Sequence, residues 1–446
     1  MLTVLVNMNS KMSPVLLFLF FCLTIHFTNG GKSKYISACY YTNWSPVKQE
    51  AKARLFPEDL PGNLCTHLVY AFVKIKDDLS IYTSEEKDLT GNYEKFNALK
   101  KQYNTVTLLS VGGEAAENRH FEMVSATVEN RTKFTDNIIT YVRRYNFDGI
   151  DIDWEYPNSF TRHNFTLLLK TLRDSIEKEV EKSKRNKLVL SAAVGVGKQR
   201  ITDGYEVDKV SKYVDFLNVM AYDFHGSWNK ITGFKSPLYA RKNDLRYEKE
   251  LSQEWSIEYW IKLGAPKNKL VLGMTAAGNT YTLKNATKHG LGAPVEKAGE
   301  KGPYTKQEGF LSYYEICNKL NKDNYTYEWD DIQTVPFAYK GDQWIGFDDY
   351  RSIQLKTKWL ISQQLAGAML WSLDLDDFSD MCGKGAFPLT KAIRYTLDHD
   401  VGLVTTTESP TTKRPKITTT AGATYVHMSY YLAAYILTAY IFYYNM

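Results

Sequence analysis

The chain has 446 residues, of which 44% are hydrophobic and 14% aromatic, so it can bury a large core and is not disordered as a whole. Its formal charge of +5 is small for this length, and no basic run interleaves with aromatic residues, which excludes an obvious nucleic-acid surface. Length alone allows one large domain or two or three ordinary ones.

The first thirty residues predict a secretory signal peptide. A lysine precedes the apolar run VLLFLFFCLTIHF, and small and polar residues follow it up to Gly30 and Gly31. The run is too short for a typical membrane span, which favours cleavage near these glycines over an uncleaved signal anchor. We therefore expect residues 1–30 to lie outside the fold and the rest of the chain to enter the secretory pathway.

Between residues 32 and 400, eight short apolar runs of β-prone residues alternate with stretches of helical pattern, such as 165–185. Nearly continuous apolar strands that alternate with helices indicate a parallel sheet covered by helices. Eight such units predict an α/β fold, a (β/α)8 TIM barrel, with catalytic residues at the carboxyl ends of its strands. The predicted strands are 35–41, 66–73, 105–111, 149–154, 188–194, 216–222, 270–276 and 366–373.

The interval between the seventh and eighth runs is much longer than the others. It holds the segments GPYTKQEGFLSYYEI and VPFAYKGDQWIGFDD, which indicate a helix and several short strands. We expect a small α+β insertion domain, about residues 277–347, beside the mouth of the barrel.

Beyond the barrel, the sequence predicts a linker and an anchor. Residues 401–424 are rich in Thr and Pro, which is typical of an extended stalk that cannot build a core. Residues 425–446 are apolar and nearly uncharged over about one membrane-span length. They are interpreted either as a glycolipid-anchor signal or as a C-terminal transmembrane helix. Both predict a protein tethered at the outer cell surface; without a tether it would be secreted.

Export also gives the cysteines a role. Cys22 lies in the signal segment, and the four others predict two disulfides, for which three connectivities are possible. Five Asn-X-Ser/Thr sequons are compatible with glycosylation. The one at Asn43 is not expected to carry a glycan, which would obstruct the expected cleft. The candidate glycosylation sites are Asn130, Asn164, Asn285 and Asn324.

The stretch FDGIDIDWEYP (147–157) places acidic residues on one predicted strand. Side chains alternate along a strand, so Asp151, Asp153 and Glu155 share one face and the apolar residues between them share the other. Grouped carboxyls cannot all ionise at low cost, so at least one pKa should be raised, as a general acid requires. Glu155, nearest the barrel mouth, is the candidate acid.

This strand has two other possible interpretations, a metal cluster and a solvated strand end. A metal cluster is disfavoured because no histidine joins the acids, so we expect no metal. A solvated strand end is disfavoured because apolar residues alternate with the acids. Asp148 has the wrong parity for the shared face and is expected to be structural.

The sequence DGIDIDWE resembles the Asp-x-x-Asp-x-Asp-x-Glu signature of chitinases in glycoside hydrolase family 18. Further segments resemble other strands of that family and follow in the family's order across about 370 residues. The resemblance extends to the α+β insertion of animal-type chitinases, and it implies the disulfides Cys39–Cys65 and Cys317–Cys382. The matching segments are ACYYTNW (38–44), CTHLVYAF (65–72), LLSVGG (108–113), NVMAYDFHGSW (218–228) and AGAMLWSLDLDDF (366–378).

The resemblance implies endo-acting hydrolysis of β-1,4-linked N-acetylglucosamine in chitin or its oligomers, without a cofactor. In this family the substrate's own N-acetyl oxygen attacks the anomeric carbon, so no enzyme nucleophile is needed. Glu155 would be the general acid and base, Asp153 would bind the acetamido N–H, and Asp151 would hold the proton balance of the group. We expect a monomer.

The same resemblance suggests the residues that bind the sugar. Tyr222 would hydrogen-bond the acetamido oxygen, Asp223 a sugar hydroxyl, and Trp371 would form the floor under the scissile sugar. Each aromatic residue could instead only fill the core. Further walls of the cleft would come from Tyr40, Phe72, Trp44, Trp228 and Met220.

Three positions depart from the family pattern. Glu114 stands where chitinases commonly have a Trp at the cleft entrance, and Ala277 and Asn279 replace a Tyr and an Arg of the sugar site. These changes favour an alternative, a catalytically weak or inactive chitin-binding lectin or growth-factor-like protein. The complete acid series favours the enzyme. Cleavage of the chitobiose core of N-glycans is a third possibility, which the insertion domain disfavours.

Overall fold

The computed structural model describes residues 34–242 and 244–399. The predicted signal peptide, Thr/Pro-rich linker and hydrophobic tail lie outside the described residues, and their assignments remain predictions. Among the helices that are described, none is both long and apolar enough to cross a membrane.

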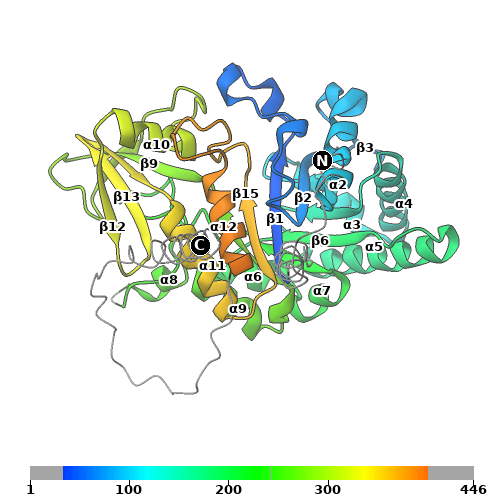
Figure 1. Cartoon of the computed structure of the whole chain (residues 1–446). Coiled ribbons are helices and arrows are strands. Elements are labelled where there is room, and N and C mark those ends of the chain that lie inside the picture. The colour runs from blue at the N-terminus through cyan, green and yellow to red at the C-terminus, as the bar shows by residue number, and fades with distance from the viewer. Residues whose placement is uncertain (1–33, 243, 400–446) are drawn as a thin grey trace, which may run out of the picture. The chain divides into compact units, whose positions relative to one another are not determined.

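Eight parallel strands form a closed barrel, as the sequence predicts (Figure 1). The first strand, β1, pairs with β2 on one side and with the last barrel strand, β15, on the other, which closes the sheet. A short strand, β3 (Ile81–Tyr82), extends the end of β2 antiparallel to it. The barrel strands are β1 (Ile36–Thr42), β2 (His67–Ile75), β4 (Val106–Gly112), β5 (Gly149–Asp153), β6 (Val189–Val194), β7 (Phe216–Val219), β8 (Leu270–Thr275) and β15 (Gly367–Trp371).

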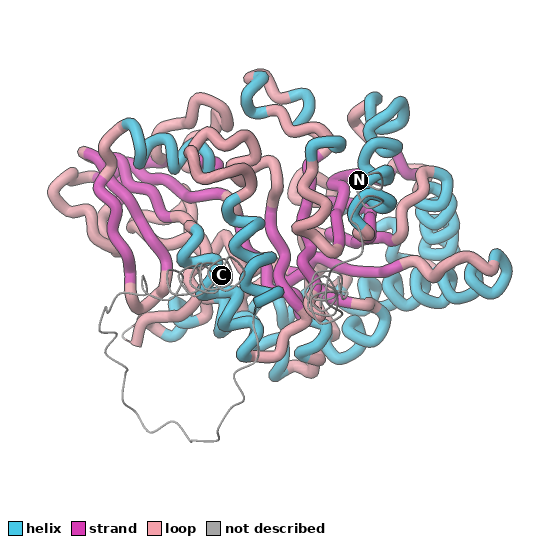
Figure 2. Tube along the Cα trace, viewed as in Figure 1, coloured by secondary structure: helices cyan, strands magenta, loops and turns pink. Residues whose placement is uncertain are grey.

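Helices surround the barrel strands (Figure 2). The strands are buried on both faces, which explains their nearly continuous apolar sequences. The outward apolar side chains join those of the helices in one large hydrophobic cluster, while a second, smaller cluster fills the barrel interior. The helices are α2 (Tyr93–Tyr103), α3 (Asn118–Ala126), α4 (Val128–Arg144), α5 (Arg162–Ser183), α6 (Lys198–Gly204), α7 (Val207–Tyr213), α8 (Arg246–Lys249), α9 (Gln253–Lys262), α10 (Tyr313–Lys322), α11 (Tyr350–Ser362) and α12 (Pro388–His399).

A six-stranded antiparallel sheet with α10 forms the insertion between the seventh and eighth barrel strands, as expected. Its strands β9, β12 and β13 gather beside α10 at one side of the barrel (Figure 1). Phe337 and Trp344 belong to a separate hydrophobic cluster of this sheet. The strands are β9 (Ala277–Leu283), β10 (Val295–Ala298), β11 (Phe310–Ser312), β12 (Thr326–Asp330), β13 (Val335–Lys340) and β14 (Gln343–Gly346).

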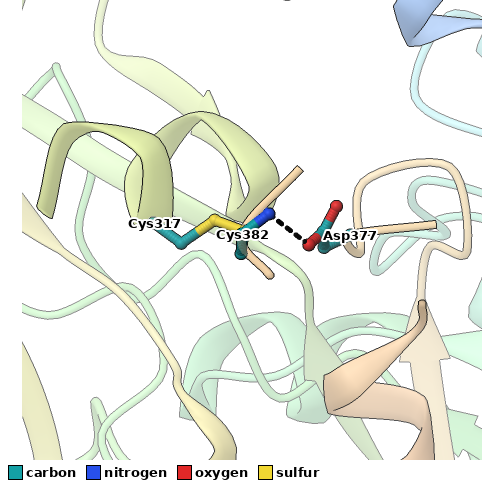
Figure 3. A group of neighbouring side chains, drawn as sticks. All are labelled: Cys317, Asp377 and Cys382. Atoms are coloured by element: carbon teal, nitrogen blue, oxygen red, sulfur yellow. Dashed lines mark hydrogen bonds between the residues drawn. A yellow bond between two sulfur atoms is a disulfide. The ribbon is translucent and has the colours of Figure 1, made fainter. Parts of the chain in front are cut away.

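The four cysteines among the described residues form the disulfides Cys39–Cys65 and Cys317–Cys382, the pairs that the family resemblance implies. The second joins α10 of the insertion to the loop after β15 (Figure 3). Asp377 lies beside this disulfide and accepts a hydrogen bond from the backbone N–H of Cys382 at 2.9 Å. Because both sulfurs are in the disulfide, they are not the thiolates that a metal ion would need.

Candidate active site

The acid-bearing strand β5 is buried along its whole length. Its apolar side chains face the helices, and Trp154, just beyond the strand, stacks on Phe121 of α3 with ring centroids 5.3 Å apart. The acidic side chains lie on the opposite side, so the predicted alternation is confirmed for the strand. The strand ends at Asp153, and Glu155, two residues further on, is only partly buried at the barrel mouth.

Asp151 is fully buried and held by hydroxyl groups from three other strands. The register places Ser110 of β4 and Ser191 of β6 directly beside it. The Ser110, Ser191 and Tyr40 hydroxyls donate to its carboxylate at 2.7, 2.6 and 2.7 Å. Burial raises the pKa of Asp151, and these donors oppose the rise because they stabilise the ionised form. Its side chain therefore has a single fixed orientation.

Among the three acids, Asp153 has the surroundings that most favour the protonated form. It is 3% exposed, and its Oδ1 atom has no hydrogen-bond partner among the described residues. Burial, followed by the negative charges of Glu155 and Asp151, raises its pKa well above the usual value. An unpaired buried polar atom is costly and rare, so this oxygen is suited to a hydrogen bond from a ligand.

Glu155 is the most accessible of the three acids. Burial raises its pKa; the charges of Glu114 and Asp223 raise it further, while a hydrogen bond from Tyr156 and the charge of Arg200 lower it. The charge of Glu114 affects Glu155 because the β4–β5 register puts Gly112 opposite Asp153. Glu114 and Glu155 each follow two residues later, so the two segments run side by side. A carboxyl at the mouth with a raised pKa can hold a proton for transfer.

Aromatic residues gather beside the acids at the same end of the barrel. The Trp371 ring, at the end of β15, stacks on Phe72 with centroids 5.8 Å apart, and Tyr40 lies 5.6 Å from it. Trp44 completes the group at 6.5 Å from Trp371 and is 41% exposed. An aromatic face of this kind packs well against the C–H groups of a sugar ring.

Of the remaining predicted binding residues, Met220 and Tyr222 are buried in the barrel interior, where they belong to the same cluster as Tyr40 and Phe72. Within the described part of the chain, the Tyr222 hydroxyl makes a long contact, 4.0 Å, with the sulfur of Met369. Burial raises the pKa of Tyr222 well above the usual value, so its hydroxyl stays protonated and neutral.

Asp223 and Trp228 lie further out. The half-exposed Asp223 carboxylate forms an ion pair with the largely buried Lys235. Trp228 is 63% exposed and its ring covers Gly226, where a Cβ atom would collide with it. The described contacts therefore bring the acids, Trp371 and their aromatic neighbours together, and leave Trp228 at the periphery.

The three departures from the family pattern have different surroundings. Glu114 is exposed at the mouth. Ala277 and Asn279 are buried in β9, where the Asn279 amide donates to the backbone carbonyls of Gly233 at 2.8 Å and His225 at 3.2 Å. Asn279 thus ties the insertion sheet to the loop after β7.

Two side chains at strand ends are structural. Asp148 accepts hydrogen bonds from the Thr107 N–H at 3.0 Å and the Lys100 ammonium at 2.9 Å, in line with the structural role expected for it. The Asn43 amide is 3% exposed and donates to the Phe72 carbonyl and the Asp88 carboxylate. This burial leaves no access for a glycan.

Sequence reasoning missed several residues that position the acids. Asn218 donates to the Tyr40 hydroxyl at 3.0 Å, and Ser110 and Ser191 orient Asp151. The available signal was one serine within each of two largely apolar strands. Nothing in the sequence marked Arg200, whose guanidinium lies 4.0 Å from the centroid of the Tyr156 ring.

Comparisons with known proteins agree with this geometry. Residues 36–376 match the model of the glycosyl hydrolases family 18. Mouse chitotriosidase-1 is 39% identical over 81% of this chain and 77% of its own length, and human chitinase-3-like protein 2 is 38% identical over 82% of this chain and 94% of its own. The active chitinase of Trichuris suis, whose crystal structure is solved, superposes with a TM-score of 0.80 at 34% identity, over 82% of this chain and all of that one.

The chain belongs to glycoside hydrolase family 18, and its fold is the (β/α)8 barrel with an insertion domain. The relatives differ in activity. Human YKL-39, 37% identical with a TM-score of 0.78 over 82% of this chain and all of that one, is a pseudo-chitinase with retained chitooligosaccharide binding. Membership of the family therefore defines a glycosidase fold, and activity depends on the residues of the site.

Proposed function

We propose that the protein is a chitinase that cleaves β-1,4 linkages between N-acetylglucosamine units with retention of configuration. The observation that carries this proposal is the complete acid series. In it, Asp153, whose Oδ1 has no partner among the residues that the structure describes, lies between the fixed Asp151 and the accessible Glu155. A site that only bound sugar would have no need for a carboxyl with a raised pKa at the mouth.

In the proposed reaction the substrate supplies its own nucleophile. Glu155 gives its proton to the leaving glycosidic oxygen while the acetamido carbonyl oxygen attacks the anomeric carbon. Asp153 accepts the acetamido N–H, and the Tyr222 hydroxyl donates to the acetamido oxygen. Glu155, now ionised, takes a proton from the water that opens the oxazolinium intermediate.

The surrounding residues would hold the sugar in the geometry for this attack. Trp371 forms the floor, with Phe72 and Trp44 beside it. Asp223 would accept from a sugar hydroxyl, and Tyr40 fixes Asp151 from below through its 2.7 Å hydrogen bond. Positioning of this kind supplies much of the rate enhancement in enzymes that bind the reacting groups rigidly.

A second function, binding without hydrolysis, is favoured by one observation: the exposed carboxylate of Glu114 lies at the mouth, where it offers no aromatic face to a sugar.

We further propose that the protein acts outside the cell, tethered through its C-terminal tail. Its two disulfides support an oxidising compartment.

Product analysis with matched substrates tests the proposal. The protein is incubated with N-acetylglucosamine tetramers to hexamers and with fully deacetylated oligomers of the same length. Cleavage of the acetylated oligomers alone, with the β-anomer formed first in NMR spectra, is expected from the substrate-assisted route. Binding of the acetylated oligomers without any product would instead establish the lectin.

A further inference from the structure

A cavity of about 360 Å³ lies on the outer side of the barrel, between α6, α8 and α9. Its volume falls in the range of ligand sites, roughly 300–1,000 Å³. It is separate from the candidate active site, since none of the three acids lines it. The residues around it are Lys198, Lys249, Glu250, Trp255, Glu258, Tyr259 and Lys262.

Two aromatic rings form the apolar part of this cavity. Trp255 and Tyr259, one turn apart on α9, stack with centroids 4.8 Å apart and planes 15° apart. Both residues are only partly buried, so ring surface remains open to the cavity. Aromatic faces bordered by groups that donate and accept hydrogen bonds are the chemistry that recognises a pyranose ring.

The charges on the rim favour a neutral ligand. Three lysines and two glutamates surround the rings, so cationic donors and anionic acceptors nearly balance. Such a mixture can serve sugar hydroxyls, which both donate and accept, and it offers little attraction to a polyanion.

The short helix α6 links this cavity to the candidate active site. Arg200 of α6 lies over Tyr156, the residue after the catalytic candidate Glu155. Two residues on, Thr202 forms a 3.0 Å hydrogen bond with the Tyr259 hydroxyl, and Lys198 of the same helix lines the cavity. The cavity is therefore a near neighbour of the cleft.

We propose that this outer cavity is a second binding site for a neutral N-acetylglucosamine chain, with the Trp255 and Tyr259 rings as its platform. The choice of ligand rests on the proposed function, because the same helix, α6, contacts both Tyr156 beside the candidate acid and Tyr259 of the cavity. The site itself is independent of catalysis.

The test is a titration in a Glu155→Gln background, in which no substrate is consumed. Calorimetry with N-acetylglucosamine tetramer measures the number of molecules bound per chain. We expect that number to fall by one when Trp255→Ala and Tyr259→Ala are added, and adsorption to insoluble chitin to weaken about tenfold, or about 1.4 kcal/mol. Tyr259→Phe, which keeps the ring, should bind like the parent.

Controls separate this proposal from the proposed function. Tyr395→Ala removes an exposed aromatic residue of α12, far along the chain from the cavity, and should leave the stoichiometry unchanged. If the cleft does not bind sugar, the parent should still bind one tetramer and the double variant none. An unchanged stoichiometry in the double variant, or equal binding of a glucose tetramer lacking acetamido groups, would overturn the proposal.

Discussion

The change Glu155→Gln should abolish activity and at the same time stabilise the fold. Glutamine keeps the shape of the side chain but cannot transfer a proton. Loss of a positioned general acid typically costs about 10²–10⁴-fold in rate, which corresponds to about 2.7–5.5 kcal/mol in the activation barrier. The assay is kcat on N-acetylglucosamine hexamer, with products resolved by mass.

The expected gain in stability follows from the raised pKa of the acids. Burial raises the pKa of Glu155, and Glu155 in turn raises the pKa of Asp153. An acid whose folded pKa lies above its unfolded value binds more protons in the folded state, so the free energy of unfolding falls as pH rises through that interval. Each pKa unit corresponds to about 1.4 kcal/mol.

Wild type and Glu155→Gln should therefore have similar stability well below pH 4, where the unfolded carboxyls are also protonated. The variant should become the more stable protein as pH rises above about 4.3, the unfolded pKa of Glu. Guanidinium unfolding at several pH values measures the difference. A variant that retains more than a tenth of the wild-type rate, or that is less stable than wild type at pH 7, would contradict the reasoning.

Three further changes test the surroundings of the acids and a buried ion pair at the start of α11. Glu114→Gln removes a charge that raises the pKa of Glu155, so the basic limb of the pH–kcat/KM profile should move to lower pH. This shift should vanish in 1 M salt, which screens the charge, and a salt-independent shift would indicate a structural change. Trp371→Ala should raise KM for the hexamer about tenfold through loss of the stacking face, with Trp371→Phe intermediate; equal KM values would exclude a sugar contact. Lys356→Met leaves the fully buried Asp348 without its ion-pair partner and should lower the free energy of unfolding by about 3–5 kcal/mol. Adding Asp348→Asn should recover part of this loss. Equal losses in the single and the double variant would show that the unpaired charge is not the cause.

The sequence predicted the barrel because its signals are local. Each strand is a short apolar run bounded by helical pattern, and alternation along residues 149–155 placed the acids on one face and the apolar side chains on the other. The strand limits were less certain: β5 ends at Asp153, so Glu155 projects from the chain beyond the strand. The candidate acids could be identified from the sequence because an acidic side chain is recognisable from the residue alone.

The partners of these acids were not readable, because they are set by how the sheet closes. Ser110 and Ser191 meet Asp151 through the register of β4, β5 and β6, and Tyr40 reaches it from 111 residues away in sequence. Register in a barrel depends on the stagger of all eight strands together, which no single segment encodes.

The sequence alone thus determined the fold class, the chemical type of the site and the candidate acids, since periodicity and side-chain chemistry are properties of short segments. Only the tertiary structure decided that Asn279 ties the insertion to the loop after β7 and that α6 lies between the cleft and an aromatic cavity. It also decided that an oxygen of Asp153 has no hydrogen-bond partner in the described part of the chain. These features depend on contacts between distant segments, which form only when the whole chain packs.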